Sequence, residues 1–329
     1  MNHLKINNKI KSVEAFAPAS SANFAVGYDL IGCAISGLGD VIKLVRRDDN
    51  QVVIQEISGV PGSEKLPMDS TKNVCAAVII KFLADYNLQI GFDIYLQKGI
   101  SLSSGMGGSA ASSVAAMIAV NGFLENPLGL EGLADYTIYG ESLISGGIYH
   151  GDNAIPSLYG GLVLLQSSKP CKMIQLPSLD VKVVIVHPHI EVETREARKL
   201  MQEPFKISDI VKQSGNLAAF ISSLYTKNID LFGSSLVDAL VEPRRSKLIT
   251  GFDDVKSSAL SNGALACSIS GSGPSLFAIT RDNETADAVA DAMMTAFSKH
   301  QLKSEFWISD LNSQGAYIKN IENFEKTSV

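Results

Sequence analysis

The sequence lacks the features that mark membrane-spanning, secreted or nucleic-acid-binding proteins. No apolar run approaches the ~18 residues that a bilayer span requires, since the longest, Val74–Ile80 and Val114–Val120, have seven residues each. The lysines at 5, 9 and 11 precede no apolar h-region, which argues against a secretory signal. With 28 basic and 34 acidic residues the net charge is −6, so the surplus of basic groups needed to neutralise nucleic-acid phosphates is missing. We expect neither a membrane nor a nucleic-acid partner.

Cysteine is scarce and unpaired in sequence. The four residues Cys33, Cys75, Cys171 and Cys267 lie far apart and form no CxxC motif. This spacing favours reduced, buried thiols over a disulfide framework or a zinc site. We therefore expect a cytoplasmic protein. Internal repeats, charge blocks and low-complexity tracts are also missing, and 46% apolar with 19% charged residues predicts a globular chain with a sizeable core.

The length of 329 residues predicts about two domains. A change of composition at 167–172 places the boundary, giving an N-terminal lobe of residues 1–168 and a C-terminal lobe of residues 169–329. Strand-like and helix-like segments mix without a regular βαβ order, so the fold class is α+β in two lobes.

Hydrophobic periodicity predicts the individual elements. Strands are expected at 41–45, 52–57, 92–97, 162–165, 181–186, 265–269 and 275–280. Helices are expected from Thr71 and Asn73 to residue 86, and at 110–124, 130–144, 193–202, 207–226, 229–240 and 284–299.

The most informative segment, residues 98–113, leaves a strand, passes three glycines (Gly105, Gly107 and Gly108) and enters a helix. Glycine allows a close backbone approach to a ligand, and helix N-terminal amides suit a phosphate. Three interpretations stay open: a plain Gly/Ser turn, a dinucleotide site with Glu125 as its acid, and a nucleoside-triphosphate loop without a Walker lysine. Glu125 does not end a second strand, which argues against the dinucleotide site.

Residues 99–168 contain no lysine or arginine. A polyphosphate there needs backbone amides, a divalent cation, Lys98 or basic groups from the other lobe. Glu141 shares the apolar face of its helix with Ile138 and Ala134, so it is a candidate Mg²⁺ ligand. The alternative is a glutamate at the edge of a solvated face.

Three stretches, 17–35, 98–113 and 263–275, resemble in order the three motifs of the GHMP small-molecule kinases. The similarity spans nearly the whole chain, and three motifs in order are far more specific than one. The resemblance implies a ribosomal-S5-domain-2-like N-terminal lobe, a ferredoxin-like C-terminal lobe, and ATP with Mg²⁺.

Within that superfamily the chain resembles the homoserine kinase branch. The signatures are Pro18-Ala-Ser-Ser-Ala-Asn23 with Gly27-x-Asp29, His150-x-Asp152-Asn153, Thr194-x-x-x-Arg198 and Glu242-Pro-x-Arg245. The resemblance implies transfer of the γ-phosphoryl group of ATP to the side-chain hydroxyl of L-homoserine, in threonine biosynthesis, by a homodimer.

The resemblance also implies the site residues, position by position. Ser109 and Glu141 would hold Mg²⁺, and Asn73 would lie near the adenine. The expected ATP contacts are Asn73, Ser101, Leu102, Ser103, Ser104, Gly105, Met106, Gly107, Gly108, Ser109, Ala110, Ala111 and Ser112. The expected L-homoserine contacts are Asn23, Asp29, His150, Asn153, Thr194, Arg198, Arg245 and Gly271. Anionic groups for an ammonium and arginine forks for a carboxylate suit a zwitterionic amino acid.

The catalytic residues implied are Asn153, Ser109 and Glu141. In-line phosphoryl transfer demands mainly positioning and charge stabilisation. Asn153 cannot act as a general base, so it would orient the hydroxyl. The chain departs from the family pattern at Ser101, Gly108, Tyr149 and Arg244, and Arg244 leaves open which arginine faces the substrate. The alternatives are a kinase for another hydroxylated metabolite and a non-catalytic ATP-binding regulator.

Overall fold

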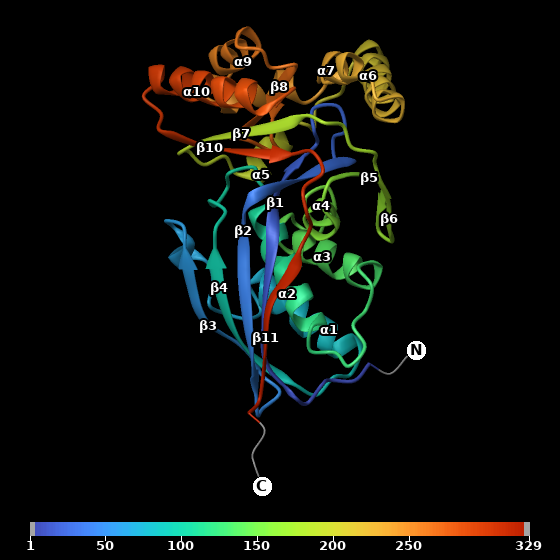
Figure 1. The fold of residues 1–329 in the computed structure, drawn as a ribbon, viewed down its shortest axis with the longest axis vertical. Helices are drawn as coiled ribbons and strands as arrows, with labels where there is room; N and C mark the ends of the chain where they lie inside the picture. The colour runs from blue at the N-terminus through green and yellow to red at the C-terminus, as the bar shows by residue number, and fades with distance from the viewer. Residues whose placement is uncertain (1–3, 326–329) are drawn as a thin grey trace.

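The computed structural model describes residues 4–325. Two lobes are stacked along the long axis of the molecule, with the N-terminal lobe below and most of the C-terminal half above (Figure 1). Each lobe is a sheet with helices packed on it, so the α+β class expected from the mixed pattern is confirmed.

The lower lobe is built on a seven-stranded sheet of order β11-β1-β2-β4-β3, with β5 pairing β2 and β6 pairing β5. Along β2, buried Asp40, Ile42 and Leu44 alternate with partly exposed residues, so one face of the sheet turns to the core. Its strands are β1 (Ile10–Ala22), β2 (Ile31–Arg47), β3 (Val52–Gly59), β4 (Gly91–Lys98), β5 (Leu162–Ser168), β6 (Cys171–Gln175) and β11 (Tyr317–Asn323).

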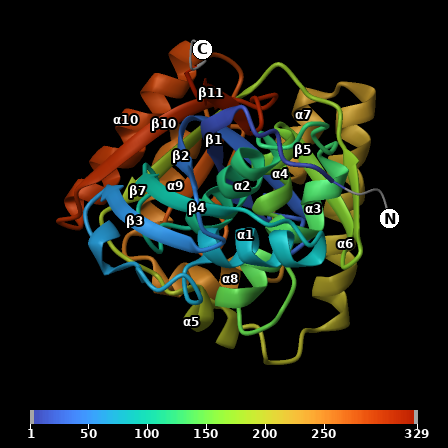
Figure 2. The same ribbon diagram turned by 90° about the horizontal axis from the view of Figure 1, so that it is seen from below.

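Four helices cover the inner face of this sheet. Helix α2 is buried on every side from Ala110 to Asn121, and its small apolar residues and lack of charge allow it to pack between the sheet and its neighbours. Figure 2 shows α1, α3 and α4 gathered beside it. The bounds are α1 (Val74–Asp85), α2 (Gly108–Asn121), α3 (Glu131–Ile144) and α4 (Ala154–Tyr159), with a 3₁₀ turn η1 at Ser63–Lys65.

The upper lobe contains a four-stranded antiparallel sheet of order β10-β7-β9-β8. Numbered within the lobe this order is 4-1-3-2, which is the ferredoxin-like arrangement implied by the resemblance. The strands are β7 (Lys182–Pro188), β8 (Ala266–Ile269), β9 (Leu276–Thr280) and β10 (Ser304–Asp310). The helices are α5 (Thr194–Lys199), α6 (Ile207–Thr226), α7 (Ile229–Ser235), α8 (Glu242–Arg245), the 3₁₀ turn η2 (Ser246–Leu248), α9 (Phe252–Ser261) and α10 (Asn283–Lys299).

The prediction of a helix over 229–240 is wrong for its second half, because α7 ends at Ser235. The next residues bond to side chains instead of continuing the helix. The amide of Ala239 donates to Gln213 of α6 at 2.7 Å, and Asp238 accepts from the amides of Leu240 and Val241 at 2.8 Å. These bonds turn the chain into α8, which carries Arg245.

The chain returns from the upper lobe to the lower lobe at its last strand. Strand β11 pairs antiparallel with β1, and β6 pairs with β5, so both belong to the lower sheet. The division at residue 168 stays a prediction, and it falls between two strands that pair with each other, Ser168 opposite Cys171. Among the described residues, no helix combines the length and apolar character that crossing a membrane requires.

Candidate active site

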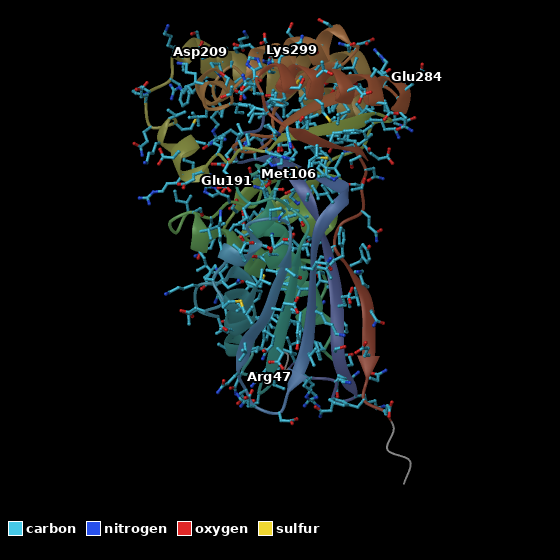
Figure 3. All side chains as sticks on the ribbon, turned by 90° about the vertical axis from the view of Figure 1, so that its left-hand side faces the viewer. Arg47, Met106, Glu191, Asp209, Glu284 and Lys299 are labelled. Atoms are coloured by element: carbon cyan, nitrogen blue, oxygen red, sulfur yellow. The ribbon has the colours of Figure 1, made fainter. Side chains whose placement is uncertain are left out.

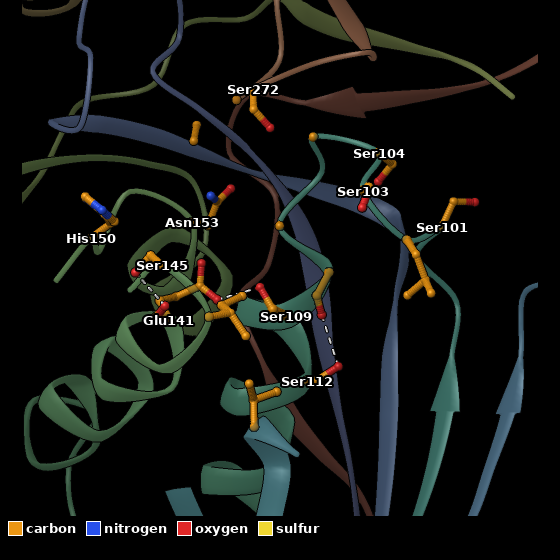
Figure 4. Close-up of a pocket in the computed structure, with 18 of the residues that line it drawn as sticks. Ser101, Ser103, Ser104, Ser109, Ser112, Glu141, Ser145, His150, Asn153 and Ser272 are labelled. Atoms are coloured by element: carbon orange, nitrogen blue, oxygen red, sulfur yellow. Dashed lines mark hydrogen bonds between the residues drawn. The ribbon is translucent and has the colours of Figure 1, made fainter. Parts of the chain in front are cut away.

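A cavity of about 370 Å³ lies where the two lobes meet. Its walls come from the 101–109 loop, the end of α3, the segment before α4, the chain after β1, and residues of α5, α8 and the 271–272 turn from the upper lobe. Met106 marks this junction in Figure 3, and Figure 4 shows the cavity in close-up.

The glycine loop approaches other backbone and side-chain atoms too closely for larger residues. A Cβ on Gly105 would lie 2.5 Å from the carbonyl oxygen of Ser270, and one on Gly107 would lie 2.2 Å from Oγ of Ser20. Both glycines also have positive φ, 78° and 67°. Gly107 caps α2 without a side-chain hydrogen bond, and Gly107, Gly108 and Ser109 line the cavity, so the start of α2 is placed as in a phosphate-binding helix.

The upper lobe holds this loop from above. Oγ of Ser275 donates to the carbonyl of Ser104 at 2.7 Å, and Oγ of Ser270 donates to that of Gly105 at 2.9 Å. The amide of Gly271 donates to Ala22 at 3.1 Å. The first, second and third sequence motifs therefore meet at one place, although they are up to 250 residues apart in the sequence.

Lys98 does not face the cavity as a free cation. Its ammonium forms a buried ion pair with Asp40 and also donates to the carbonyl of Gly108 at 2.8 Å and to Oγ of Ser112 at 2.9 Å. Asp40 accepts further bonds from the amides of Gly99 and Ile100. The charge of Lys98 is therefore already neutralised by Asp40 and does not remain to balance a polyphosphate. Its contacts link the loop to β2.

Ser109, in the first turn of α2, donates a 2.6 Å hydrogen bond to Oε1 of Glu141 on α3 (Figure 4). Glu141 is 9% exposed, and burial raises its pKa to about 7 although the Ser109 bond opposes that rise. The inward orientation expected from its helix face is thus observed. A hydroxyl and a carboxylate are hard oxygen donors of the type that Mg²⁺ prefers, so this pair fits the ion. Among the described residues no group of three or more His, Cys, Asp or Glu could hold a metal alone.

The side of the cavity near α1 is lined by apolar residues together with Lys72 and Asn73. Asn73 caps α1 by accepting from the amide of Cys75 at 3.0 Å, and it donates to the carbonyl of Pro67 at 2.9 Å. It thereby fixes the loop that carries this wall, and its place near the adenine stays a prediction. The apolar residues here are Leu66, Pro67, Val74, Leu96, Leu102 and Ile144.

The opposite side is rich in charge. Arg198 pairs with Asp29 through contacts of 2.9 and 3.3 Å. Arg245, 2% exposed, donates to the carbonyl of Gly271 at 2.9 Å, and both guanidinium groups contact the hydroxyl of Tyr28 at 3.3 Å. Arg244 instead donates to the carbonyls of Leu200, Glu203 and Pro204, outside the cavity. Of these two neighbours Arg245 lines the cavity and Arg244 does not, and the contact of Arg245 with a substrate carboxylate stays a prediction.

His150 and Asn153 complete this side. Nδ1 of His150 lies 3.6 Å from Asp29, and burial lowers the pKa of the imidazole. Oδ1 of Asn153 accepts a hydrogen bond from Oγ of Ser20 at 3.0 Å, and this bond fixes the orientation of the Asn153 side-chain amide. Nε2 of His150 and Nε of Arg198 are buried and have no hydrogen-bond partner among the described residues, so a ligand could satisfy both.

Most of the expected contacts line one cavity. They are Asn23, Asp29, Asn73, Ser101, Leu102, Ser103, Ser104, Gly105, Gly107, Gly108, Ser109, Ser112, Glu141, His150, Asn153, Arg198, Arg245 and Gly271. Met106, Ala110 and Ala111 have side chains in the core, 0–1% exposed, so only their backbone could reach a nucleotide. Thr194 begins α5, and its side chain lies outside the described part of the structure.

Sequence reasoning assigned no role to Tyr28, Asp152 or the apolar wall. Asp152 lines the cavity at 4% exposure, and burial, with the nearby charge of Asp29, raises its pKa to about 7. Asp152 stood in one of the quoted signatures, which was the available signal. The 66–67 segment carries no motif, so nothing local marked it.

Two family models match the chain. That for the GHMP kinases N terminal domain matches residues 73–161, and that for the GHMP kinases C terminal matches residues 216–299. The first range contains the glycine loop, Glu141 and Asn153, and the second contains Arg245 and the 270–275 turn.

Curated relatives and solved structures resemble the chain over almost its whole length. A homoserine kinase of Chlorobium phaeobacteroides is 42% identical over 94% of this chain and 100% of that one, and one of Xylella fastidiosa is 42% identical over 92% and 93%. The crystal structure of homoserine kinase from Cytophaga hutchinsonii superposes with a TM-score of 0.90 at 39% identity, covering 94% and 97%. The mevalonate kinase of L. major, with a TM-score of 0.71 at 16% identity over 93% and 98%, shares the fold.

Proposed function

The chain belongs to the GHMP kinases, and within them to the homoserine kinases, and we propose that it transfers the γ-phosphoryl group of ATP to the side-chain hydroxyl of L-homoserine. The product would be O-phospho-L-homoserine, for use in threonine biosynthesis. One observation carries this proposal. A single cavity has the open start of α2 beside the Ser109–Glu141 pair and, across from it, two arginines and two aspartates suited to an amino acid.

The nucleotide would lie with its adenine against the apolar wall and its phosphates on the amides of the 103–109 segment. Since Lys98 is paired with Asp40, phosphate charge would be met by amides and by Mg²⁺ on Ser109 and Glu141. When bound, the ion supplies charge neutralisation of the transferred phosphoryl group.

The acceptor would lie between Asn153 and the arginines. Arg198 and Arg245 suit its carboxylate as charged, planar donors. Asn153, held by Ser20, would orient the hydroxyl toward the phosphates without removing its proton, since an amide is not a base. Burial of the cavity walls limits water and strengthens these electrostatic contacts.

A coupled assay of ADP release tests the proposal. Purified protein with Mg²⁺ and ATP is offered L-homoserine, L-serine, shikimate and mevalonate, and L-homoserine should give the highest kcat/KM. Faster turnover of shikimate or mevalonate would mean another hydroxylated metabolite is the acceptor. Binding of MgATP without turnover of any acceptor would mean a non-catalytic regulator.

A further inference from the structure

Glu242 opens the Glu242-Pro-x-Arg245 signature, but it does not line the cavity, and nothing above gives it a role. Its Oε1 forms an ion pair with the ammonium group of Lys256 on α9, and its Oε2 accepts a hydrogen bond of 2.6 Å from Oγ of Ser268 on β8. The side chain of Glu242 is 13% exposed, and Ser268 is buried. Because both carboxylate oxygens are bonded in a sheltered place, Glu242 ties the start of α8 to α9 and to β8.

Helix α8 depends on such contacts because it is short. It has four residues, and a single helical turn is not stable in water by itself. Asp238 fixes the start of the turn by accepting a hydrogen bond from the amide of Glu242 at 2.9 Å, and the side chain of Glu242 fixes its flank. The amide of Arg245 donates to the carbonyl of Val241 at 2.9 Å, so Arg245 takes the position that this turn sets.

Burial works against the charge of Arg245. The residue is 2% exposed, and burial lowers the pKa of its guanidinium group. It donates to the carbonyl of Gly271 at 2.9 Å and to the hydroxyl of Tyr28 at 3.3 Å. Within the part of the chain that the structure describes, no carboxylate forms an ion pair with it, and the charges of Asp29 and Asp152 act on it from a greater distance. A buried charge with neutral partners gains free energy by moving toward water, so the backbone that carries Arg245 has to be held.

The spacing of Glu242 and Arg245 would also allow a direct contact. Residues three apart on a helix can form an ion pair. In the structure the carboxylate of Glu242 binds Lys256 and Ser268 instead. Lys256 therefore has two effects: it holds the carboxylate that fixes α8, and it keeps that carboxylate from neutralising the guanidinium group of Arg245 in the cavity wall.

We propose that Glu242 is a positioning residue for Arg245, because its bonds to Lys256 and Ser268 set the place from which the guanidinium group meets the acceptor substrate. This inference rests on the proposed function, in which Arg245 contacts L-homoserine. The bonds of Glu242 stay within the upper lobe, whereas Ser109 and Glu141 stand on α2 and α3 of the lower lobe. Loss of Glu242 should therefore weaken binding of the acceptor and spare binding of the nucleotide.

Steady-state kinetics of Glu242→Gln test the inference. The amide keeps the size of the side chain and an oxygen for Ser268, but it loses the ion pair with Lys256. The KM for L-homoserine should rise roughly 5- to 20-fold, whereas the KM for ATP should stay within about twofold of the wild type. Asp254→Asn is the matched control, because it removes the exposed pair that the same helix α9 forms with His300, and it should change neither KM.

A double-mutant cycle tests whether Glu242 acts through Lys256. Lys256→Met should raise the KM for L-homoserine at least as much as Glu242→Gln does, because the carboxylate is then free to turn to Arg245. The variant with both changes should bind the acceptor no more weakly than Lys256→Met alone, since the two changes break one interaction. Effects that multiply in the double variant would mean two independent contributions and would overturn the role.

Two further results would contradict the positioning role. A lower thermal midpoint with an unchanged KM for L-homoserine would make the ion pair structural only, and an equal rise of both KM values would mean that the whole upper lobe has loosened. If Glu242→Gln does not fold, Ser268→Ala removes only the neutral hydrogen bond and should still raise the KM for L-homoserine about two- to fivefold.

Turnover of L-homoserine by the wild type decides the proposed function separately. A wild type that neither phosphorylates nor binds L-homoserine defeats both the proposed function and the inference. An active wild type whose KM for L-homoserine is unchanged in these variants defeats the inference alone.

Discussion

The hydroxyl of Ser109 lies 2.6 Å from Oε1 of Glu141, so the first turn of α2 is joined to α3 at the point where the glycine loop ends. The two residues are 32 positions apart and stand on different helices. Their contact places a carboxylate at a helix start whose nearest lysine in the sequence, Lys98, is already paired with Asp40.

Glu141→Gln should therefore lower the apparent affinity of the protein for Mg²⁺. The amide keeps the size of the side chain but loses the charge that attracts a hard cation, so the Mg²⁺ concentration for half-maximal rate should rise by roughly tenfold or more. Mg²⁺ titration of the ADP-release rate measures it. Asp135→Asn, on the same helix but bonded to the amide of Cys171, is the matched control and should titrate like the wild type. Identical titrations for Glu141→Gln would remove Glu141 from the metal site.

Substitution of either arginine should mainly weaken the binding of L-homoserine, whereas substitution of Asn153 should mainly slow turnover. Arg198→Ala and Arg245→Ala should each raise the KM for L-homoserine roughly 10- to 100-fold, because each removes charge-assisted hydrogen bonds. Asn153→Ala should mainly lower kcat, since it would orient the hydroxyl. Arg244→Ala removes the neighbouring arginine, which donates to the carbonyls of Leu200, Glu203 and Pro204 and lies over the ring of Phe205, its Cζ 3.7 Å from the ring centroid. A KM raised as much by Arg244→Ala as by Arg245→Ala would contradict the assignment.

Gly107→Ala should damage catalysis by steric conflict. The new methyl would displace the hydroxyl of Ser20 from Asn153, so kcat/KM should fall more than about tenfold. Gly37 also has a positive φ, 77°, but nothing lies within 4 Å of a Cβ there. Gly37→Ala should thus cost about 1 kcal/mol of stability from backbone strain and leave kcat/KM unchanged. Equal kinetic effects would show that backbone strain alone matters.

The buried pair of Lys98 and Asp40 should be essential to folding. Lys98→Met leaves an uncompensated buried carboxylate and should lower the free energy of unfolding in urea by about 3–5 kcal/mol. Adding Asp40→Asn should recover part of this loss, because the charge is removed while an oxygen remains for the amides of Gly99 and Ile100. Lys81→Met, at the exposed pair with Asp85, should cost less than about 1 kcal/mol. A loss at Lys98 no larger than at Lys81 would refute the role.

His187 should make the protein acid-sensitive. Burial lowers the pKa of this imidazole to about 4 from its ordinary 6.5. Ser275 donates its proton to Ser104, so Nδ1 of His187 must donate to Ser275. Because the unfolded chain binds the proton more readily, stability is present above pH 6.5 and is lost as the pH falls toward 4, by about 2 kcal/mol between pH 7 and pH 5.

Urea unfolding of His187→Gln at pH 7 and pH 5 measures this contribution. The variant should lose about 2 kcal/mol of the wild-type pH dependence, whereas His189→Gln, at a half-exposed ring 6.0 Å away, should keep it. An unchanged pH dependence in His187→Gln would mean that other groups cause the acid sensitivity.

Much of the fold was predictable because its signals are local. Helix α6 occupies 207–226 as its apolar period predicts, and Asn73 caps α1 where the sequence expected a helix start. Strand β11 was not predicted, since its partners on β1 are some 300 residues earlier and its exposed edge lacks a clear alternation. Pairing over that separation leaves no local pattern.

The sequence alone determined which chemical groups this protein has for its site: a glycine loop, a serine and a glutamate for a metal, and arginines with acids for a zwitterion. Only the tertiary structure decided how their charges are shared. It neutralises Lys98 with Asp40 and Arg198 with Asp29, places Arg245 rather than Arg244 in the wall of the cavity, and buries Asp152 near the charge of Asp29. The reason is that a charge acts through its neighbours in space and its burial, and both are set by packing between distant segments.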